Sequence, residues 1–547
     1  MSAGPPRPTD GPSATESWRS PRSVEATPAA SEDSSGQANG HALASAARKV
    51  VGLAVLLLAV LFVPSAVGLG QQAKLTASDG GASDRFGGSV AISGDTAVVG
   101  SYTDDVGANT NQGSAYVYAR SGTVWTEQAN LTARFGATED YFGTSVAISG
   151  DTAVVGAQGD DVAETDQGSA YVFTRSGTVW TQQAKLTASD GAAFDYFGFS
   201  VALSGDTVVV GSHNDDVGAN TDQGSAYVFT RSGTVWTQQA KLTARFGAAS
   251  DLLGYSVGLS GDTAVVGAYG ADVDPSPNQG SAYLFMRSGT VWTQQAKLTA
   301  NDGVANDFFG FSVALNGDTV LVSAVGTNTY QGSAYLFMRS GTVWAQQAKL
   351  TASDGAAWDE FGSSVALSGN TAVVGARLDD TGTNTDQGSA YLFTGSGTVW
   401  TEQTKLTAND GAADDQFGAP VALSGGTAIV GAWLDDTGAN TDQGSAYVYA
   451  AAPTAVGVRS TSAVRTERGV LVRWRTAGEV GVLGYRVYRQ RGSARVPVGA
   501  LVAARATLRG RGYAFLDRRA PQGGLRYWLR IVRLDGSGAW VGLGISR

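Results

Sequence analysis

The sequence predicts an all-β protein: a seven-bladed β-propeller of four-stranded blades, followed by a small β-sandwich. Three observations support this prediction. The 547 residues include 74 Gly and only 16% charged side chains, which suits short strands and turns better than helices. Residues 71–452 repeat one unit of about 56 residues seven times. The last copy lacks its final strand, and a matching strand precedes the first copy.

The N-terminal segment carries an export pattern. Residues 1–46 are rich in Ser, Pro, Ala and Gly, and we expect a disordered leader there. In residues 47–70, Arg48 and Lys49 precede an apolar run and a small-residue exit, which predicts a signal peptide. Counted to Leu69, the run reaches ~20 residues, enough for a retained membrane anchor instead. Both alternatives predict a secreted or cell-surface protein that touches the membrane only through this segment.

Each repeat unit is predicted to form four antiparallel strands. In the third copy these are residues 197–204, 207–211, 224–229 and 235–243. The tight turns Gly205-Asp206 and Ser232-Gly233 join the first strand to the second and the third to the fourth. Four-stranded units of this length are typical of propeller blades rather than of a solenoid.

The two ends of the repeat array predict a closed ring. The seventh copy stops after its third strand, at Tyr447-Val-Tyr449. The missing Gln-Ala-Lys-Leu-Thr strand stands at residues 72–76, before the first Phe-Gly. We expect strand 72–76 to complete the seventh blade, because this pairing removes an exposed sheet edge. The result would be a monomeric propeller.

The repeated phrases resemble a known family. Phe-Gly-x-Ser-Val-Ala, Val-Val-Gly-Ala and Gly-Ser-Ala-Tyr-Val-Phe are similar to the FG-GAP repeat, the blade unit of the integrin α-subunit head, across residues 71–450. The resemblance implies an extracellular binding or adhesion module. Integrin-type blades often hold a calcium loop, Asp-x-Asp-x-Asp-Gly, between their first two strands. Here that segment is shortened to Ser-Gly-Asp-Thr, as at residues 93–96, so this calcium site is not expected.

Most acidic residues fall in the two longer loops of each unit. Alternate connections of an up-and-down blade share a face, so these loops should form one acidic rim. The first loop family contains Asp104, Asp105, Asp160, Asp161, Asp215, Asp216, Asp222, Asp379, Asp380, Asp386, Asp435, Asp436 and Asp442. The second contains the pairs Asp79/Asp84, Asp190/Asp195, Asp302/Asp307, Asp354/Asp359 and Asp410/Asp415. Three interpretations stay open: solvated turn residues, weak calcium sites on the first loop family, and a ligand-binding rim.

A few positions depart from the repeat. Trp358 and Trp433 each occur once, in or beside the acidic loops, and are candidates for ligand contacts. The loop of the fifth unit, residues 323–332, is four residues shorter and lacks the acid pair. It is interpreted either as a neutral deletion or as a notch in the rim. Trp125 and its equivalents follow a tight turn, and we expect them to pack between blades.

The residue types favour binding over catalysis. The chain has no Cys and two His, and it contains no Gly-x-Ser-x-Gly elbow, P-loop or His-Glu-x-x-His. We therefore expect a non-catalytic module for an extracellular protein or glycan ligand, with no cofactor unless calcium binds. The alternative is a carbohydrate-active hydrolase or lyase that uses paired carboxylates. Residues 71–452 carry 15 basic and 39 acidic residues, a net charge of −24, which argues against nucleic-acid binding.

The C-terminal residues 453–547 have a different composition. They contain 18 Arg, no Lys and four acids, a net charge of +14. Alternating apolar and polar residues predict a β-sandwich that resembles a fibronectin type III domain. The resemblance implies that Trp474 is a core residue and that Tyr527 forms a tyrosine corner. The positive charge suggests docking on the acidic propeller or on an anionic cell envelope.

Overall fold

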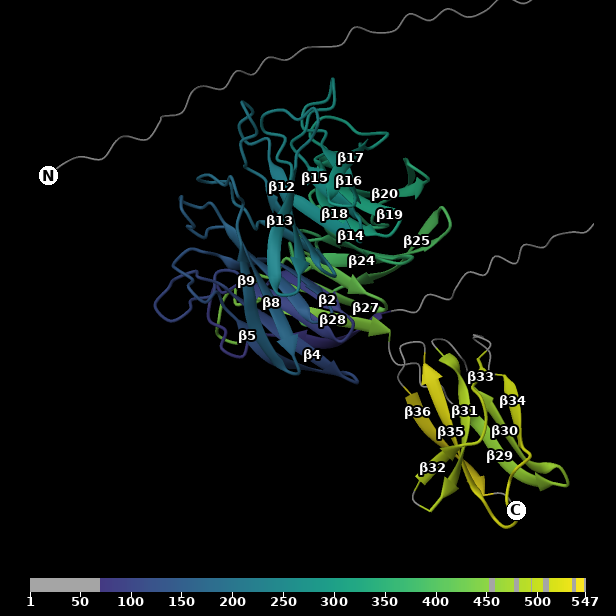
Figure 1. The fold of residues 1–547 in the computed structure, drawn as a ribbon. Coiled ribbons are helices and arrows are strands. Elements are labelled where there is room, and N and C mark those ends of the chain that lie inside the picture. Colours follow the sequence, from purple (N-terminus) through teal and green to yellow (C-terminus); the bar gives the residue numbers. More distant parts are fainter. Residues whose placement is uncertain are drawn as a thin grey trace, which may run out of the picture. The chain divides into compact units, whose positions relative to one another are not determined.

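The computed structural model describes residues 69–451, 458–476, 482–492, 494–504, 511–533 and 538–545. Figure 1 shows that the regular secondary structure of these segments is almost entirely strand, connected by loops and turns. The predicted leader, nearly all of the predicted export segment and the predicted domain boundary at residues 452–453 lie outside the described residues. No helix among the described residues is long and apolar enough to cross a membrane.

The described propeller residues form seven four-stranded sheets, as predicted. Blades one and two are β2 (Phe86–Ser93), β3 (Thr96–Ser101), β4 (Ser114–Ser121), β5 (Val124–Leu131), and β6 (Phe142–Ser149), β7 (Thr152–Ala157), β8 (Ser169–Ser176), β9 (Val179–Leu186). Blades three and four are β10 (Ser200–Ser204), β11 (Thr207–Ser212), β12 (Ser225–Ser232), β13 (Val235–Leu242), and β14 (Ser256–Ser260), β15 (Thr263–Ala268), β16 (Ser281–Ser288), β17 (Val291–Leu298). Blades five and six are β18 (Phe309–Asn316), β19 (Thr319–Ala324), β20 (Ser333–Ser340), β21 (Val343–Leu350), and β22 (Phe361–Ser368), β23 (Thr371–Ala376), β24 (Ser389–Ser396), β25 (Val399–Leu406). Blade seven is β26 (Val421–Ser424), β27 (Thr427–Ala432), β28 (Ser445–Ala451) and β1 (Leu69–Leu75). A short helix, α1 (Thr327–Tyr330), occupies the shortened loop of blade five.

Strand β1 closes the ring. It pairs antiparallel with β28, with Leu75 opposite Ala446, so the first strand of the described residues is the outer strand of blade seven. This confirms the predicted closure. The strand begins at Leu69 rather than at residue 72, so it includes two residues that the sequence analysis placed in the export segment. The innermost strand β26 of blade seven contacts β22 on one side and β2 on the other.

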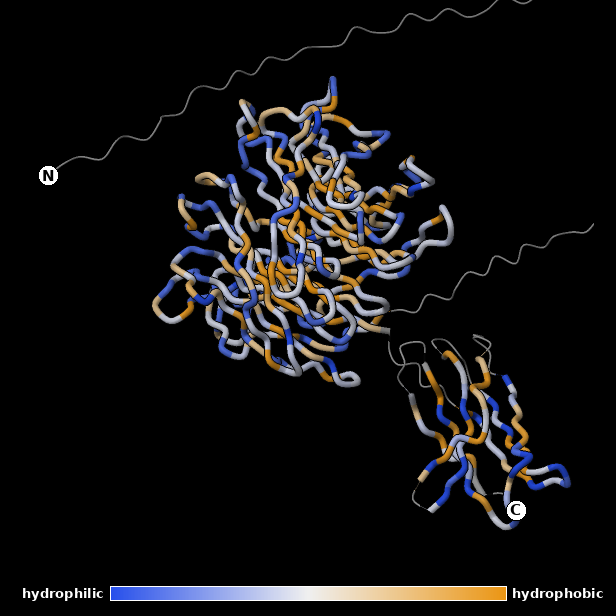
Figure 2. The backbone as a smooth tube through the Cα atoms, in the orientation of Figure 1, coloured by the Kyte–Doolittle hydropathy of each residue, from blue (hydrophilic) through white to orange (hydrophobic). Residues whose placement is uncertain are grey.

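The blades adhere through apolar side chains from neighbouring sheets. One cluster joins Val98 and Val117 of blade one to Phe142 and Val155 of blade two. Figure 2 shows hydrophobic segments concentrated in the propeller strands and hydrophilic segments in many of its loops. The Phe-Gly pair explains part of this fit. Phe142 is fully buried, and Gly143 has a φ of 98° with its missing Cβ position 2.3 Å from the carbonyl oxygen of Ser114, so no other residue fits there.

The tight-turn face also links adjacent blades. The indole nitrogen of Trp180 donates to Gln128 of the preceding blade at 3.0 Å, and the Arg175 guanidinium lies 5.3 Å from the Trp180 ring. Arg175 in turn forms an ion pair with Asp151 at 2.5 Å. The same contacts recur in other blades, which confirms that these Trp residues bridge blades.

The C-terminal domain is a β-sandwich. One sheet contains β29 (Val458–Thr466), β30 (Gly469–Thr476) and β34 (Gly512–Asp517); the other contains β32 (Ala494–Pro497), β31 (Val482–Arg491), β35 (Arg526–Arg533) and β36 (Gly538–Ile545), with β33 (Val502–Ala503) paired to β31. Trp474, as predicted, lies in the core and is only 2% exposed. Tyr527 differs from the expectation, because its hydroxyl donates to the carboxylate of Asp517 at 2.8 Å rather than to a nearby backbone carbonyl. The fibronectin type III resemblance stays a prediction.

Candidate functional site

The two longer loops of the blades interlock on one face of the propeller, here named the loop face. The loop after the second strand of each blade contacts the loop that leads into the next blade. Between blades one and two, the amide of Phe142 donates to the carbonyl of Gln112 at 2.8 Å. The side-chain amide of Asn109 donates to the carbonyl of Gly136 at 3.0 Å. These contacts hold the loop face as one connected surface.

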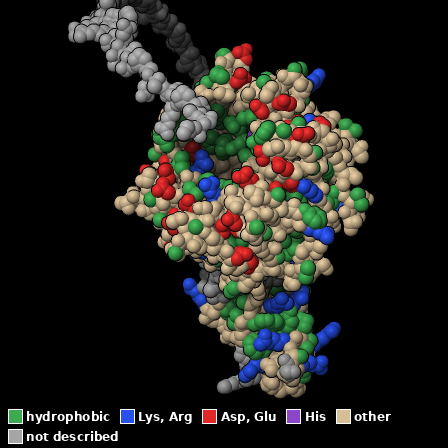
Figure 3. Space-filling model, turned by 90° about the vertical axis from the view of Figure 1, so that its left-hand side faces the viewer, with side chains coloured by type: hydrophobic (Ala, Val, Ile, Leu, Met, Phe, Trp, Pro, Cys, Tyr) green, Lys and Arg blue, Asp and Glu red, His purple; other side chains and the backbone are tan. Residues whose placement is uncertain are grey.

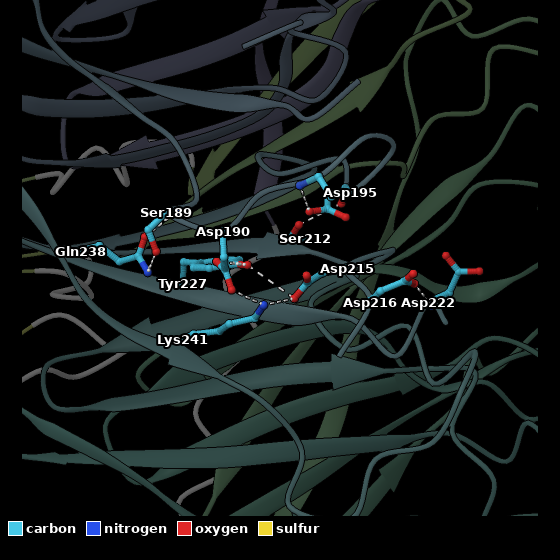
Figure 4. A network of polar contacts seen from close by, with 11 residues as sticks. Ser189, Asp190, Asp195, Ser212, Asp215, Asp216, Asp222, Tyr227, Gln238 and Lys241 are labelled. Atoms are coloured by element: carbon cyan, nitrogen blue, oxygen red, sulfur yellow. Dashed lines mark hydrogen bonds and ion pairs between the residues drawn. The ribbon is translucent and has the colours of Figure 1, made fainter. Parts of the chain in front are cut away.

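A half-buried lysine organises the acidic residues of this face, as Figure 4 shows for blade three. The Lys241 ammonium lies 2.8 Å from Asp190 and 2.7 Å from Asp215, and the Tyr227 hydroxyl donates to Asp190 at 3.0 Å. Although burial disfavours a charged ammonium, the hydrogen bonds to the two carboxylates hold the pKa of Lys241 above its usual value. Burial also opposes the ionised form of Asp190, yet the hydrogen bond from Lys241 lowers the pKa of this carboxyl.

The two residues of each predicted acid pair play different parts. Asp215 is 3% exposed and turns inward to Lys241, whereas its neighbour Asp216 is exposed and accepts a hydrogen bond from the Asp222 amide at 2.9 Å. The same capping bond joins Asp161 to Asp166, Asp380 to Asp386 and Asp436 to Asp442. No group of three or more His, Cys, Asp or Glu side chains among the described residues is placed to hold a metal ion.

Among the blades that depart from this network, blades one and four do so in opposite directions. In blade one, Asn130 replaces the lysine, and its amide donates to Asp79 at 3.3 Å. Burial, together with the neighbouring charge of Asp84, raises the pKa of Asp104 to about 6. In blade four, Ala271 replaces the buried aspartate, and Lys297 has no ion-pair partner among the described residues. Burial lowers the pKa of Lys297.

Replacing Asn130 with lysine should stabilise the protein in a pH-dependent way. Because the pKa of Asp104 is raised in the folded state, its stabilising contribution is present at low pH and is lost as pH rises from about 4 to 6. Asn130→Lys supplies the missing ammonium and removes this loss. We expect the melting temperature of the variant minus that of the parent to grow between pH 4 and 6 and then level off. A difference that stays constant with pH would contradict this assignment.

The sequence analysis did not identify the lysine and tyrosine of this network. A usable signal was present, because Ser and Tyr of Gly-Ser-Ala-Tyr occur in all seven repeats and the Gln-Ala-Lys-Leu lysine in most. It also missed two exposed aromatic residues. Phe135 and Phe246 are 84% and 85% exposed, and stand where other repeats have the first aspartate of the second loop family.

Four positions of each repeat vary strongly. One of them, the third residue before Phe-Gly, lies in an exposed loop and is Trp358 in blade six; the other three lie closer to the strands. These three are the residue before Phe-Gly, the residue after it, and the first residue of the loop after the second strand. The last of these reads Tyr102, Gln158, His213, Tyr269, Val325, Arg377 and Trp433 from blade one to blade seven. All three lie at the loop-face end of the two inner strands of a blade, so they surround the centre of the ring.

In blades three to five the variable positions form a continuous row of aromatic rings. Phe199 lies 4.3 Å from His213 and 4.9 Å from Tyr255, measured between ring centroids, and Tyr255 lies 4.5 Å from Tyr269. The row continues through Phe308, Phe311 and Tyr330 to Trp358. Figure 3 shows a hollow in the propeller where hydrophobic side chains gather, bordered by acidic and some basic ones. We name this row the aromatic row.

Two charged residues lie close to the aromatic row. Arg377 forms an ion pair with Glu360 at 2.7 Å, and both influence the hydroxyl of Tyr255. Burial raises the pKa of Tyr255 to about 12, so this hydroxyl is a neutral donor at physiological pH. His213 is also neutral, because burial lowers its pKa to about 4, and its Nδ1 atom has no hydrogen-bond partner. The row therefore presents apolar faces with neutral polar groups.

The two unique tryptophans occupy different environments. Trp358 is 57% exposed and stacks on Tyr330 from the shortened loop, with 4.8 Å between ring centroids. It also lines a pocket of about 320 Å³, together with Asp380, Asp386 and Lys405. Trp433 is half-buried, donates to Gln416 at 3.1 Å and lies 4.9 Å under the Arg85 guanidinium. Trp358 is thus the more accessible of the two.

Comparison with known proteins gives one family. A family model for the FG-GAP repeat matches residues 69–118, 125–173, 180–229, 236–285, 292–337, 344–393 and 400–449. Among solved structures, the chain is similar to the crystal structure of Sqt1 from Chaetomium thermophilum, with 13% sequence identity and a TM-score of 0.38. That similarity covers 87% of this chain and 100% of the other. No curated protein matches the chain.

Proposed function

Because the chain belongs to the FG-GAP repeat family, we propose that its propeller is a non-catalytic binding module for an extracellular protein or glycan. The ligand contacts the loop face at the aromatic row and at Trp358. Fold alone does not fix a function, so the proposal depends on this surface.

The contrast between constant and variable positions carries the proposal. Gly-Ser-Ala-Tyr is identical in all seven repeats, and its Ser or Tyr hydroxyl donates to the inner aspartate in several blades. The first residue of the loop after the second strand has six different identities in seven repeats. Side chains that only maintain the scaffold have no reason to differ at this one place. Diversity concentrated on one face of an otherwise constant scaffold, with aromatic residues adjacent in blades three to five, is the pattern expected of a recognition site on a repeated scaffold.

The proposal includes a setting for the protein. We infer export through the segment ending near Leu69, a secreted or cell-surface location with a role in adhesion, and a monomeric propeller. The net charge of −24 over residues 71–452 supports a partner other than nucleic acid. No catalytic residue is assigned, because the two carboxylates of an acid pair turn in different directions and the inner one is held by lysine, tyrosine or serine. This arrangement gives no support to the hydrolase or lyase alternative.

The test uses probes of both ligand classes. The chain from residue 69 to 547 would be applied to a glycan array and to immobilised fibronectin, fibrinogen and collagen. The double variant Tyr269→Ala/Trp358→Ala should lower the affinity for a bound probe at least about tenfold. A control variant, Val124→Ser/Val235→Ser, changes exposed residues on the opposite face and should bind like the parent. The proposal would be overturned by an equal loss of affinity in the two double variants, by absence of binding of the parent chain to every probe, or by release of cleaved glycan.

We also infer that the propeller folds without calcium. In blade three the Lys241 ammonium already neutralises Asp190 and Asp215. No group of three or more acidic side chains within the described residues is placed to hold a metal ion. The melting temperature should change by less than about 1 °C between millimolar calcium and excess chelator. Calorimetry should show no saturable heat on calcium addition. A saturable heat with a raised melting temperature would restore the calcium interpretation of the acidic loops.

A further inference from the structure

The outer face of the larger sheet in the C-terminal domain carries an unusual set of side chains. Along β31 and β35, Tyr485 and Leu529 turn into the core and are fully buried. The alternate residues face the other way. The register places Arg486 opposite Arg530, Tyr488 opposite Trp528, and Arg530 opposite Trp540 of β36. Together with Arg495 of β32, these residues form a surface that we name the Trp–Arg face: Arg486, Tyr488, Arg495, Trp528, Arg530 and Trp540.

Aromatic rings hold the guanidinium groups of this face in place. The Arg495 guanidinium lies 3.8 Å from the Trp528 ring centroid and 4.6 Å from that of Trp540. The Arg530 guanidinium lies 5.9 Å from Trp540, whose ring packs edge-on against Tyr488 at 4.8 Å. A guanidinium stacked on a ring is attracted by cation–π interaction and keeps the N–H groups on its edge free for hydrogen bonds.

These cations have no acceptor within the described part of the domain. The only ion pair there joins Arg489 to Asp517, which is buried away from the Trp–Arg face. Arg486, Arg495 and Arg530 take part in no ion pair or hydrogen bond among the described residues, and the Nε atom of Arg486 is buried without a partner. Each guanidinium offers five N–H donors. The face therefore presents many donors that are fixed in orientation and have no oxyanion to accept their hydrogen bonds within the described residues.

We propose that the Trp–Arg face binds a linear anionic polysaccharide through its carboxylate or sulfate groups. A guanidinium that is stacked on a ring can still donate two parallel hydrogen bonds from its edge to two oxygens of one carboxylate or sulfate group. Adjacent strands lie about 4.8 Å apart, so the face offers cations in successive rows along an extended polymer. Trp540 is 42% exposed and leaves part of its ring for contact with a sugar. The net charge of +14 over residues 453–547 attracts the polymer.

The aromatic geometry disfavours single-stranded nucleic acid, the other common polyanion. Proteins that bind single strands stack successive bases on open aromatic faces. Here Arg495 lies over the rings of both Trp528 and Trp540. The proposal does not depend on the ligand of the propeller, because the Trp–Arg face lies entirely within the C-terminal domain.

The test measures binding of the chain from residue 69 to 547 to heparin, alginate, neutral dextran and duplex DNA at physiological salt. Arg495→Ala/Arg530→Ala should weaken binding to heparin or alginate at least about tenfold. The matched control is Arg473→Ala/Arg475→Ala, which removes the same charge from exposed positions on the other sheet. This control should lose no more than about threefold. Both variants should melt within a few degrees of the parent.

Four outcomes would overturn the proposal. They are equal loss in the two double variants, binding to DNA as tight as to the polysaccharides, binding to dextran, and absence of binding to either anionic polysaccharide. A competition experiment tests whether the acidic propeller, rather than a polysaccharide, binds the Trp–Arg face. If excess residues 69–451 remove heparin binding without contacting heparin, the face is a docking site for the propeller, and the polysaccharide assignment fails.

Discussion

A chain that lacks residues 69–75 is expected to lose the closed ring and a large part of its stability. These residues form β1, the only partner of the outer edge of β28 in blade seven. Deletion removes the ladder hydrogen bonds, the buried Leu75 and the Lys74 ammonium, which lies 2.8 Å from Asp410 and 2.7 Å from Asp435. We expect a loss on the order of 5–10 kcal/mol in the free energy of unfolding. The unpaired β28 should also promote association.

The comparison needs two chains that differ only in this strand. One begins at residue 69 and the other at residue 76; thermal unfolding and light scattering are followed for both. A synthetic peptide of residues 69–76 should raise the melting temperature of the shorter chain, and a scrambled peptide should not. If the shorter chain is monomeric and as stable as the longer one, the closure contributes nothing and the prediction is wrong.

Replacing Lys241 with methionine is expected to be the most destabilising single change in the loop-face network. The substitution keeps an unbranched side chain but leaves Asp190 and Asp215 without a cation, and Asp215 is 3% exposed. Removing one partner of a largely buried ion pair costs about 3 kcal/mol. Because Lys241 holds the pKa of Asp190 below its usual value, the penalty should shrink at acid pH, where the carboxyl is protonated in the variant.

Blade four supplies the matched control for this prediction. Lys297 occupies the same repeat position, but Ala271 and Phe246 stand where blade three has Asp215 and Asp190. Burial disfavours its charge and lowers its pKa. Lys297→Met should therefore leave the melting temperature unchanged or raise it. Equal destabilisation by the two substitutions would mean that the lysines act through packing alone.

The fold was predictable because the same order of strands and turns recurs in seven repeats. A single Phe-Gly pair or Gly-Asp turn does not identify a fold, but the recurrence of both at a constant spacing locates the boundaries of the blades. The displaced strand at residues 72–76 was enough to predict ring closure, because it supplies the strand that the seventh repeat lacks. Its start at Leu69 was not predictable, because residues 69–71 lack the repeat pattern and follow an apolar segment.

The candidate site was predictable only in part. The position of the acidic residues along each repeat predicted that they lie on one face of the propeller. It did not predict which member of each acid pair turns inward. That choice depends on contacts with Lys241 and Tyr227, which are brought in from neighbouring strands. The aromatic row was missed for a similar reason. Phe199, Tyr255 and Phe311 are 56 residues apart in sequence and become neighbours only when the ring forms.

The shared blade has a consequence for the order of folding. Within blades one to six, every strand pairs with its neighbour in sequence, so these hairpins need only short loops to close. The pairing of Leu75 with Ala446 joins residues 371 positions apart (446 − 75), and it requires almost the whole propeller to have emerged from the ribosome. Contacts of such separation form late and slowly. The first described strand of the propeller, β1, can therefore pair only after its partner β28 has been synthesised, and ring closure should be the slow kinetic phase of folding.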